Sequence, residues 1–123
     1  MKLKLLIALL VAAICLAVSC KKNNKDGSCL PSDITACVQS AIDSSMAVAK
    51  GVLYTQIDAY QYQGKKVYLF YAGCCDRMNP LKDGSCNFLF SPSGGISGGG
   101  DMTHPDFFKD AVKISTVWQD PRN

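Results

Sequence analysis

The stretch Val52–Gly73, VLYTQIDAYQYQGKKVYLFYAG, decides the fold that the sequence predicts. It is rich in β-branched and aromatic residues, which favour strands, and a glycine-containing turn at Gln63–Lys66 interrupts it once. We therefore predict a β-hairpin. Successive residues of its second arm point to opposite faces, and both faces are apolar, which is typical of a central strand covered by a helix on one side. The apolar residues of this arm are Val67, Tyr68, Leu69, Phe70 and Tyr71.

The segment before the hairpin, Pro31–Gly51, carries apolar residues at the spacing of one helical face. Ser32 or Asp33 is suited to cap its start, and Lys50-Gly51 is a typical helix end. An earlier end at Ser44-Ser45 is the alternative. We expect this helix to cover the sheet.

Three further segments follow the hairpin. Residues 86–92 (CNFLFSP) predict a short strand, and residues 91–101 (SPSGGISGGGD) predict an irregular loop. Residues 111–120 (AVKISTVWQD) alternate in the manner of a closing strand, while residues 76–85 are expected to form a loop. The predicted fold class is therefore α+β, with one N-terminal helix packed on a small antiparallel sheet of three to four strands and stapled by disulfides.

The first residues indicate export. Lys2 and Lys4 precede the apolar run Leu5–Val18, which is shorter than the roughly 20 residues of a membrane-spanning helix. This pattern is typical of a secretory signal peptide, predicted over residues 1–19. The next residue, Cys20, begins a polar segment, as in bacterial lipoproteins whose mature N-terminal cysteine carries a lipid. The alternative is ordinary secretion, with Cys20 as a plain thiol.

The rest of the chain divides into a tether over residues 20–28 and a single domain over residues 29–123. Two acyl chains or more hold a protein firmly on a membrane, so the predicted partner of Cys20 is the cell membrane or the outer membrane. Loss of Lys2 and Lys4 lowers Lys+Arg from 13 to 11 against 10 acidic residues, a net charge of +1. This balance gives nucleic-acid binding no electrostatic support.

Exported cysteines usually pair, because the compartment is oxidising. We expect Cys37, on the apolar face of the helix, to stay unpaired as a small hydrophobe. Cys29, Cys74, Cys75 and Cys86 then form the disulfides, and a bridge between adjacent cysteines is disfavoured by strain of the intervening peptide. Two connectivities stay open: Cys29–Cys74 with Cys75–Cys86, or Cys29–Cys75 with Cys74–Cys86.

Reactive chemistry is the alternative use of these residues. A nucleophilic cysteine needs a base, and the chain has one histidine, His104, which nothing in the sequence places beside a cysteine. Zinc held by Cys74, Cys75, Cys86 and His104 has suitable ligand types, although adjacent cysteines are unusual ligands of one tetrahedral ion. We expect no catalytic constellation, no metal site and no cofactor.

Three other patterns favour structural roles. The glycine loop lacks both nucleotide-binding spacings and is expected to be a wide turn with positive φ angles. A calcium site would need scattered aspartates to gather without a recognised spacing, and these are Asp76, Asp83, Asp101 and Asp106. The tyrosines favour cross-strand packing over a ligand-binding face, and these are Tyr54, Tyr60, Tyr62, Tyr68 and Tyr71.

The stretch from Val67 to Phe108, with the downstream ISTVWQDPR, resembles a family of small, uncharacterised Bacteroidota lipoproteins with a domain of unknown function. The resemblance covers roughly residues 29–122, and its most specific parts are Cys-Cys-Asp and Gly-Gly-Ile-x-Gly-x-Gly-Asp. Phe90 and His104 stand where relatives often carry cysteines, which implies that His104 replaces a structural cysteine.

The predicted function is a lipid-anchored, non-enzymatic binding module of the cell envelope, periplasmic or surface-facing. Its ligand is an unknown protein or glycan, bound through the sheet face or the glycine loop. The alternative is an envelope hydrolase or metal-binding protein that uses His104 with a nearby cysteine or aspartate.

Overall fold

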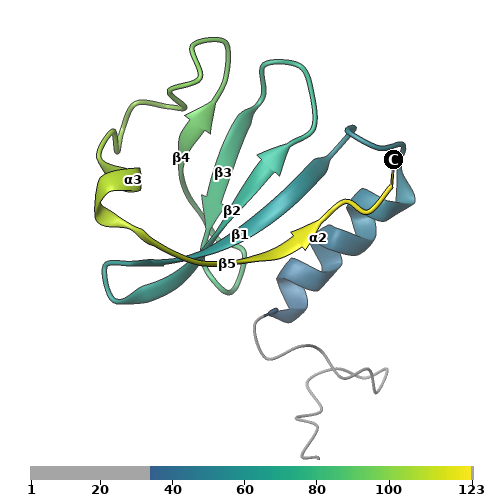
Figure 1. The fold of residues 1–123 in the computed structure, drawn as a ribbon, viewed down its shortest axis with the longest axis horizontal. Coiled ribbons are helices and arrows are strands. Elements are labelled where there is room, and N and C mark those ends of the chain that lie inside the picture. The colour runs from purple at the N-terminus through teal and green to yellow at the C-terminus, as the bar shows by residue number, and fades with distance from the viewer. Residues whose placement is uncertain (1–33, 123) are drawn as a thin grey trace, which may run out of the picture.

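The predicted hairpin forms the centre of a five-stranded antiparallel sheet (Figure 1). The computed structural model describes residues 34–122. In chain order the elements are α2 Ala36–Ala47, β1 Tyr54–Tyr62, β2 Lys65–Ala72, β3 Met78–Lys82, β4 Phe88–Gly94, α3 Phe107–Asp110 and β5 Val112–Gln119. The strand order is β4-β3-β2-β1-β5, so the α+β class is confirmed, with one strand more than the three to four expected.

The turn between β1 and β2 is shorter than predicted. It consists of Gln63 and Gly64, whose φ angles are 47° and 75°. Positive φ at both central residues is the requirement of the two-residue turn whose twist matches that of the flanking strands. Lys65 and Lys66, expected in the turn, already belong to β2.

Strand β3 was missed, because residues 76–85 were predicted to be a loop. Pro80 lies within it, and proline cannot donate to a strand ladder. In the structure Pro80 falls at a register shift between Asn79 and Leu81, where the pairing with β4 is interrupted. Leu81 pairs with β2 and is fully buried, so side-chain burial favours a strand at this position despite the proline.

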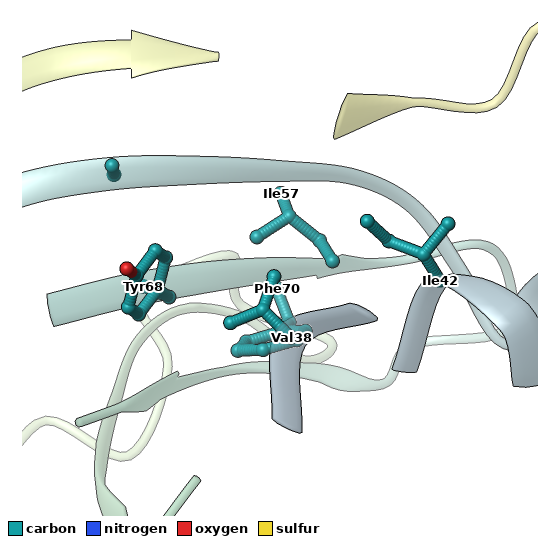
Figure 2. Packing of buried hydrophobic residues seen from close by; sticks show 6 residues of the cluster. Val38, Ile42, Ile57, Tyr68 and Phe70 are labelled. Carbon is teal, nitrogen blue, oxygen red and sulfur yellow. The ribbon is translucent and has the colours of Figure 1, made fainter. Parts of the chain in front are cut away.

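Helix α2 covers one face of the sheet. Val38 and Ile42 project from it onto Ile57 of β1 and Phe70 of β2 (Figure 2). The backbone N–H of Val38 donates to the Thr35 hydroxyl at 3.4 Å, so Thr35 is the N-cap. The caps predicted for the helix start, Ser32 and Asp33, lie outside the described residues.

The opposite face of the sheet has its own core. Val67 and Leu69 of β2 point into it, on the other side from Tyr68 and Phe70. Phe107 of α3 covers this second core and is 1% exposed. The other buried members are Tyr60, Leu81 and Phe90. Both faces of β2 are therefore buried, as its sequence predicted.

The disulfides differ from those expected. Cys37, predicted to be unpaired, bonds to Cys86 with a Cα–Cα distance of 5.9 Å, and this joins α2 to the turn between β3 and β4. The apolar face of α2 packs against the sheet where that turn arrives, so the position that suggested a buried thiol also brings it to a partner. The predicted partner Cys29 lies outside the described residues.

The second disulfide joins the neighbours Cys74 and Cys75. The sequence disfavoured this bridge because of strain in the intervening peptide, and it assigned the two cysteines to separate partners because neighbouring strand residues point to opposite faces. Strand β2 ends at Ala72, and Cys75 has a φ of 70°, so the alternation of a strand no longer applies. Both predicted connectivities, which divided Cys74 and Cys75 between distant partners, are therefore wrong in the described residues.

The C-terminal residues close the end of α2. The Arg122 guanidinium donates to the carbonyl oxygens of Ser45 at 3.0 Å and Val48 at 2.6 Å. It also forms an ion pair with Asp120 at 2.7 Å. The last carbonyls of a helix have no partner within the helix. Arg122 satisfies them from a segment distant in sequence and ties the end of β5 to α2.

We expect loss of the Cys37–Cys86 disulfide to destabilise the domain by about 4 kcal/mol, because the bridge closes a long loop in the unfolded chain. The variant is Cys37→Ala/Cys86→Ala, and the measurement is equilibrium unfolding in urea without reductant. Cys74→Ala/Cys75→Ala is the matched control. Its free energy of unfolding should fall much less, because the Cys74–Cys75 bridge closes almost no loop. Equal losses of unfolding free energy in the two double variants would contradict the prediction that the Cys37–Cys86 disulfide is the more stabilising of the two.

Asp120→Asn should lower stability at neutral pH, and its effect should shrink in acid. Hydrogen bonds from Arg122 lower the pKa of Asp120 from 3.8 to about 2. A carboxyl group with a depressed folded pKa stabilises the fold above its unfolded pKa, and that contribution is lost as pH falls from about 4 towards about 2. Urea unfolding of wild type and variant, from about pH 7 to about pH 3, measures the difference. A difference that is constant with pH would refute the prediction.

Candidate ligand-binding site

A cavity of about 360 Å³ opens at the hairpin end of the sheet. The turn between β1 and β2 contributes Gln63, and the start of β2 contributes Lys65. The start of β4 contributes Phe88 and Leu89. His104, from the segment between β4 and α3, completes one side. Small-molecule sites usually enclose roughly 300–1,000 Å³ and combine apolar walls with a few polar groups. This cavity has that composition and is at the small end of the range.

The apolar wall of the cavity is exposed to solvent. Phe88 is 60% exposed and Leu89 is 41% exposed, although both are large hydrophobic residues. Tyr62 lines the cavity next to them and packs edge-on against the ring of Phe90, with centroids 5.9 Å apart. Large apolar side chains gathered in a hollow, rather than scattered singly, are typical of a binding surface.

His104 lies flat on Phe90. The two ring centroids are 3.8 Å apart and the planes differ by 17°. The resemblance noted from the sequence implies a pair of cysteines at these two positions in relatives, and the structure does place the two side chains in contact. Phe90 is itself 5% exposed and held by the second core, so it fixes the plane of the imidazole.

A chain of hydrogen bonds reaches Nδ1 of His104 through Asp101 and Thr103. The Asp101 carboxylate accepts from the backbone N–H of Ser91 at 2.7 Å and from the Thr103 hydroxyl at 2.7 Å. The Thr103 hydroxyl oxygen lies 2.9 Å from Nδ1 of His104. Hydrogen bonds from Thr103, first from its side chain, lower the pKa of Asp101, which keeps that group a carboxylate.

The glycine loop makes this chain of hydrogen bonds feasible. Gly94, Gly95, Gly98 and Gly100 all have positive φ, as the sequence predicted for a wide turn. A Cβ at Gly100 would collide with the carbonyl oxygen of Ser91, so the loop folds back onto β4 at a distance that only glycine permits. This return places Asp101 beside Ser91, and Thr103 and His104 follow at the rim of the cavity.

A second polar cluster, around Asp58, lies on the same side of the sheet as the second core. The Asp58 carboxylate accepts from Thr116 at 2.7 Å and Gln56 at 2.9 Å and pairs with Lys113 at 2.8 Å. Burial acts to raise the pKa of Asp58, but these partners together lower it. Burial raises the pKa of the neighbouring Tyr71. The groups satisfy one another, so we interpret this cluster as structural.

The cysteines of the alternative chemistries are not brought to His104, and among the aspartates Asp101 is linked to it through Thr103. Cys86 packs on the α2 side of the sheet and is bonded to Cys37, whereas His104 stacks on Phe90 of the opposite core. All four described cysteines are in disulfides, so the zinc set and a cysteine nucleophile beside His104 are both absent from residues 34–122. Within the same residues no group of three or more candidate metal ligands is found.

The other residues predicted to form sites are the cysteines outside the Cys37–Cys86 bridge and the tyrosines. Cys20 and Cys29 lie outside the described residues, and Cys74 and Cys75 form an exposed turn after β2. Of the tyrosines, Tyr54 packs across strands on Phe70 at 5.1 Å, Tyr60 packs instead on Phe107 of α3 at 5.4 Å, and Tyr62 lines the cavity.

Sequence reasoning missed Phe88, Leu89 and Lys65 as site residues. One signal was available: residues 88–90 are three consecutive apolar residues in a predicted strand. A strand with one solvent-facing side exposes alternate residues, so such a run exposes an apolar side chain on at least one face unless another element covers it. The sequence alone did not indicate which face of this edge strand stays uncovered.

Comparison with known proteins identifies a family without assigning an activity. A family model described as a domain of unknown function, DUF6970, matches residues 45–120. No curated protein and no solved structure matches the chain. The match begins within α2 and ends at Asp120, so it includes every residue that lines the cavity but excludes Cys37. Neither helix in residues 34–122 has the length and apolar character needed to span a bilayer.

Proposed function

Since the chain belongs to the DUF6970 family, whose description gives no function, we propose one from the site: a binding module of the cell envelope. The module is non-enzymatic and holds a small ligand, or one unit of a larger ligand, in the cavity at the hairpin end of the sheet. The signal peptide and the lipidation at Cys20 that the sequence predicts, of the type found in Bacteroidota lipoproteins, support a position on a membrane.

The observation that carries the proposal is the exposed apolar wall inside a hollow with a polar rim. Phe88 and Leu89 remain exposed to water. Each Å² of their apolar surface therefore forgoes about 25 cal/mol of the free energy that burial would contribute. A ligand that covers them recovers this free energy. Lys65, Gln63 and His104 stand round the same hollow and supply the orientation that apolar contact alone does not give.

The anchor suits a module of this kind. Residues 20–28, which the sequence predicts to be a tether, are polar and poor in apolar residues, a composition that favours a linker over a packed segment. A domain held on a short flexible linker stays close to the membrane but turns freely. The cavity can then meet ligands presented by the envelope around it, at a raised effective concentration.

Binding is expected to be local to the cavity. The full chain carrying Cys20→Ala, which lacks the acylation site, would be titrated with a fragment set of sugars, aromatic amino-acid amides and carboxylates, with amide chemical shifts as the readout. Shifts should concentrate at residues 62–67, 88–90 and 104, and Phe88→Ala should abolish them. Val112→Ala is the matched control, since Val112 is 67% exposed but lies outside the cavity. Shifts confined to the Cys74–Cys75 turn, or none at all, would exclude this site.

Anchoring is tested separately by metabolic labelling with a fatty-acid probe in a bacterial host that processes lipoproteins. We expect the wild-type chain to take up label and to fractionate with membranes, and Cys20→Ala to do neither, because the acyl chains supply the membrane affinity. Cys74→Ala/Cys75→Ala, whose cysteines lie in the folded domain, should label like the wild type. Equal labelling of wild type and Cys20→Ala would rule out the lipid anchor.

A further inference from the structure

We propose that the ligand is a saccharide, bound with its ring against Phe88 and Leu89 and with one hydroxyl donating a hydrogen bond to Nε2 of His104. This inference rests on the proposed function, because it names the chemical class that the same cavity takes. It follows from the proton arrangement that the hydrogen-bond chain behind His104 imposes.

The tautomer of His104 is fixed by its neighbours. A threonine hydroxyl has one hydrogen, and the Thr103 hydroxyl donates it to the ionised Asp101 carboxylate at 2.7 Å. The hydroxyl oxygen is therefore left only as an acceptor toward Nδ1 of His104, 2.9 Å away. The neutral imidazole must carry its proton on Nδ1, and Nε2 is then a bare acceptor.

Nε2 is presented in a fixed direction. Stacking on Phe90 sets the plane of the ring, and the bond from Nδ1 to Thr103 sets its rotation within that plane. Within residues 34–122 Nε2 makes no hydrogen bond, and His104 is exposed and lines the cavity. A fixed acceptor at the rim of an apolar hollow selects a ligand that offers a hydrogen-bond donor there.

The other polar groups at the rim favour a ligand that both donates and accepts hydrogen bonds. The Lys65 ammonium can only donate. The side-chain amide of Gln63 donates to the Tyr62 hydroxyl at 3.3 Å, which leaves the amide oxygen of Gln63 as a further acceptor. Neighbouring hydroxyl groups match this mixture, since each hydroxyl is both donor and acceptor. An apolar peptide side chain would offer none of these three groups a hydrogen bond.

The apolar wall completes the match to a sugar ring. A pyranose has faces of C–H groups and a rim of hydroxyls, so one ligand covers Phe88 and Leu89 while its edge reaches the polar groups. The cavity of about 360 Å³ has room for one or two such rings rather than a long chain. Aromatic side chains with a polar rim suit ligands of this mixed character.

The test is a titration of the full Cys20→Ala chain with methyl β-glucoside, methyl α-mannoside and chitobiose, followed by amide shifts. N-acetyl-phenylalaninamide is the comparison probe for an apolar peptide side chain. We expect at least one saccharide to saturate shifts at residues 62–67, 88–90 and 104. Thr103→Val removes the hydroxyl and should lower the affinity for that saccharide by about fivefold, which is the effect of one lost hydrogen bond. Thr103→Ser keeps the hydroxyl and should bind the saccharide like the wild type.

Two further readouts separate recognition from simple loss of structure. Nitrogen-15 spectra of the imidazole should report the Nδ1–H tautomer in the wild type and in Thr103→Ser but a tautomer mixture in Thr103→Val. His104→Phe keeps an aromatic ring on Phe90 but removes Nε2, so it should keep the thermal midpoint of the wild type and lose saccharide binding. Saccharide binding by His104→Phe at wild-type strength would overturn the inference.

The outcomes also distinguish this inference from the proposed function. If N-acetyl-phenylalaninamide shifts the cavity residues and no saccharide does, the cavity binds a ligand but the saccharide assignment is wrong. If no probe, including the wider fragment set, shifts these residues, both proposals fail. An Nε2–H tautomer in the wild type would overturn the hydrogen-bond argument by itself.

Discussion

Burial of both faces of β2 is the constraint on which the rest of this structure depends. Val67 and Leu69 point to one side and Tyr68 and Phe70 to the other, and all four are at most 2% exposed. A strand of this kind is stable only if separate elements cover its two faces. Helix α2 covers one face, and the opposite face is closed by the short helix α3 and the aromatic residues round it.

The two covers are built differently, and this difference places the site. On the α2 side a continuous helix is tied at one end by the Cys37–Cys86 disulfide and at the other by Arg122, so that layer is closed. On the other side the cover is one turn of helix and a loop, held by Phe107 and by the stacked rings of Phe90 and His104. This short segment leaves the hairpin end of the sheet uncovered, and the cavity lies there.

The glycine loop connects fold to site. Its positive φ angles let the chain return along β4, and the close approach at Gly100 puts Asp101 next to the backbone of Ser91. The same return carries His104 onto Phe90. A loop that looked like a mere wide turn in the sequence thus determines the position, the plane and the proton arrangement of the imidazole at the rim of the cavity.

The sequence by itself determined the elements whose signals are local. β-Branched and aromatic residues with a turn glycine predicted the β1–β2 hairpin, helical spacing predicted α2, and the glycine-rich run predicted a loop with positive φ. It missed β3, because Pro80 argues against a strand unless the register shift beside it is known. It also missed the disulfide partners, because pairing depends on which turn reaches α2, and the exposure of Phe88 and Leu89, because an edge strand does not encode how far its cover extends. Only the tertiary structure decided these points, since each is set by contacts between residues distant in sequence, where spacing along the chain carries no information.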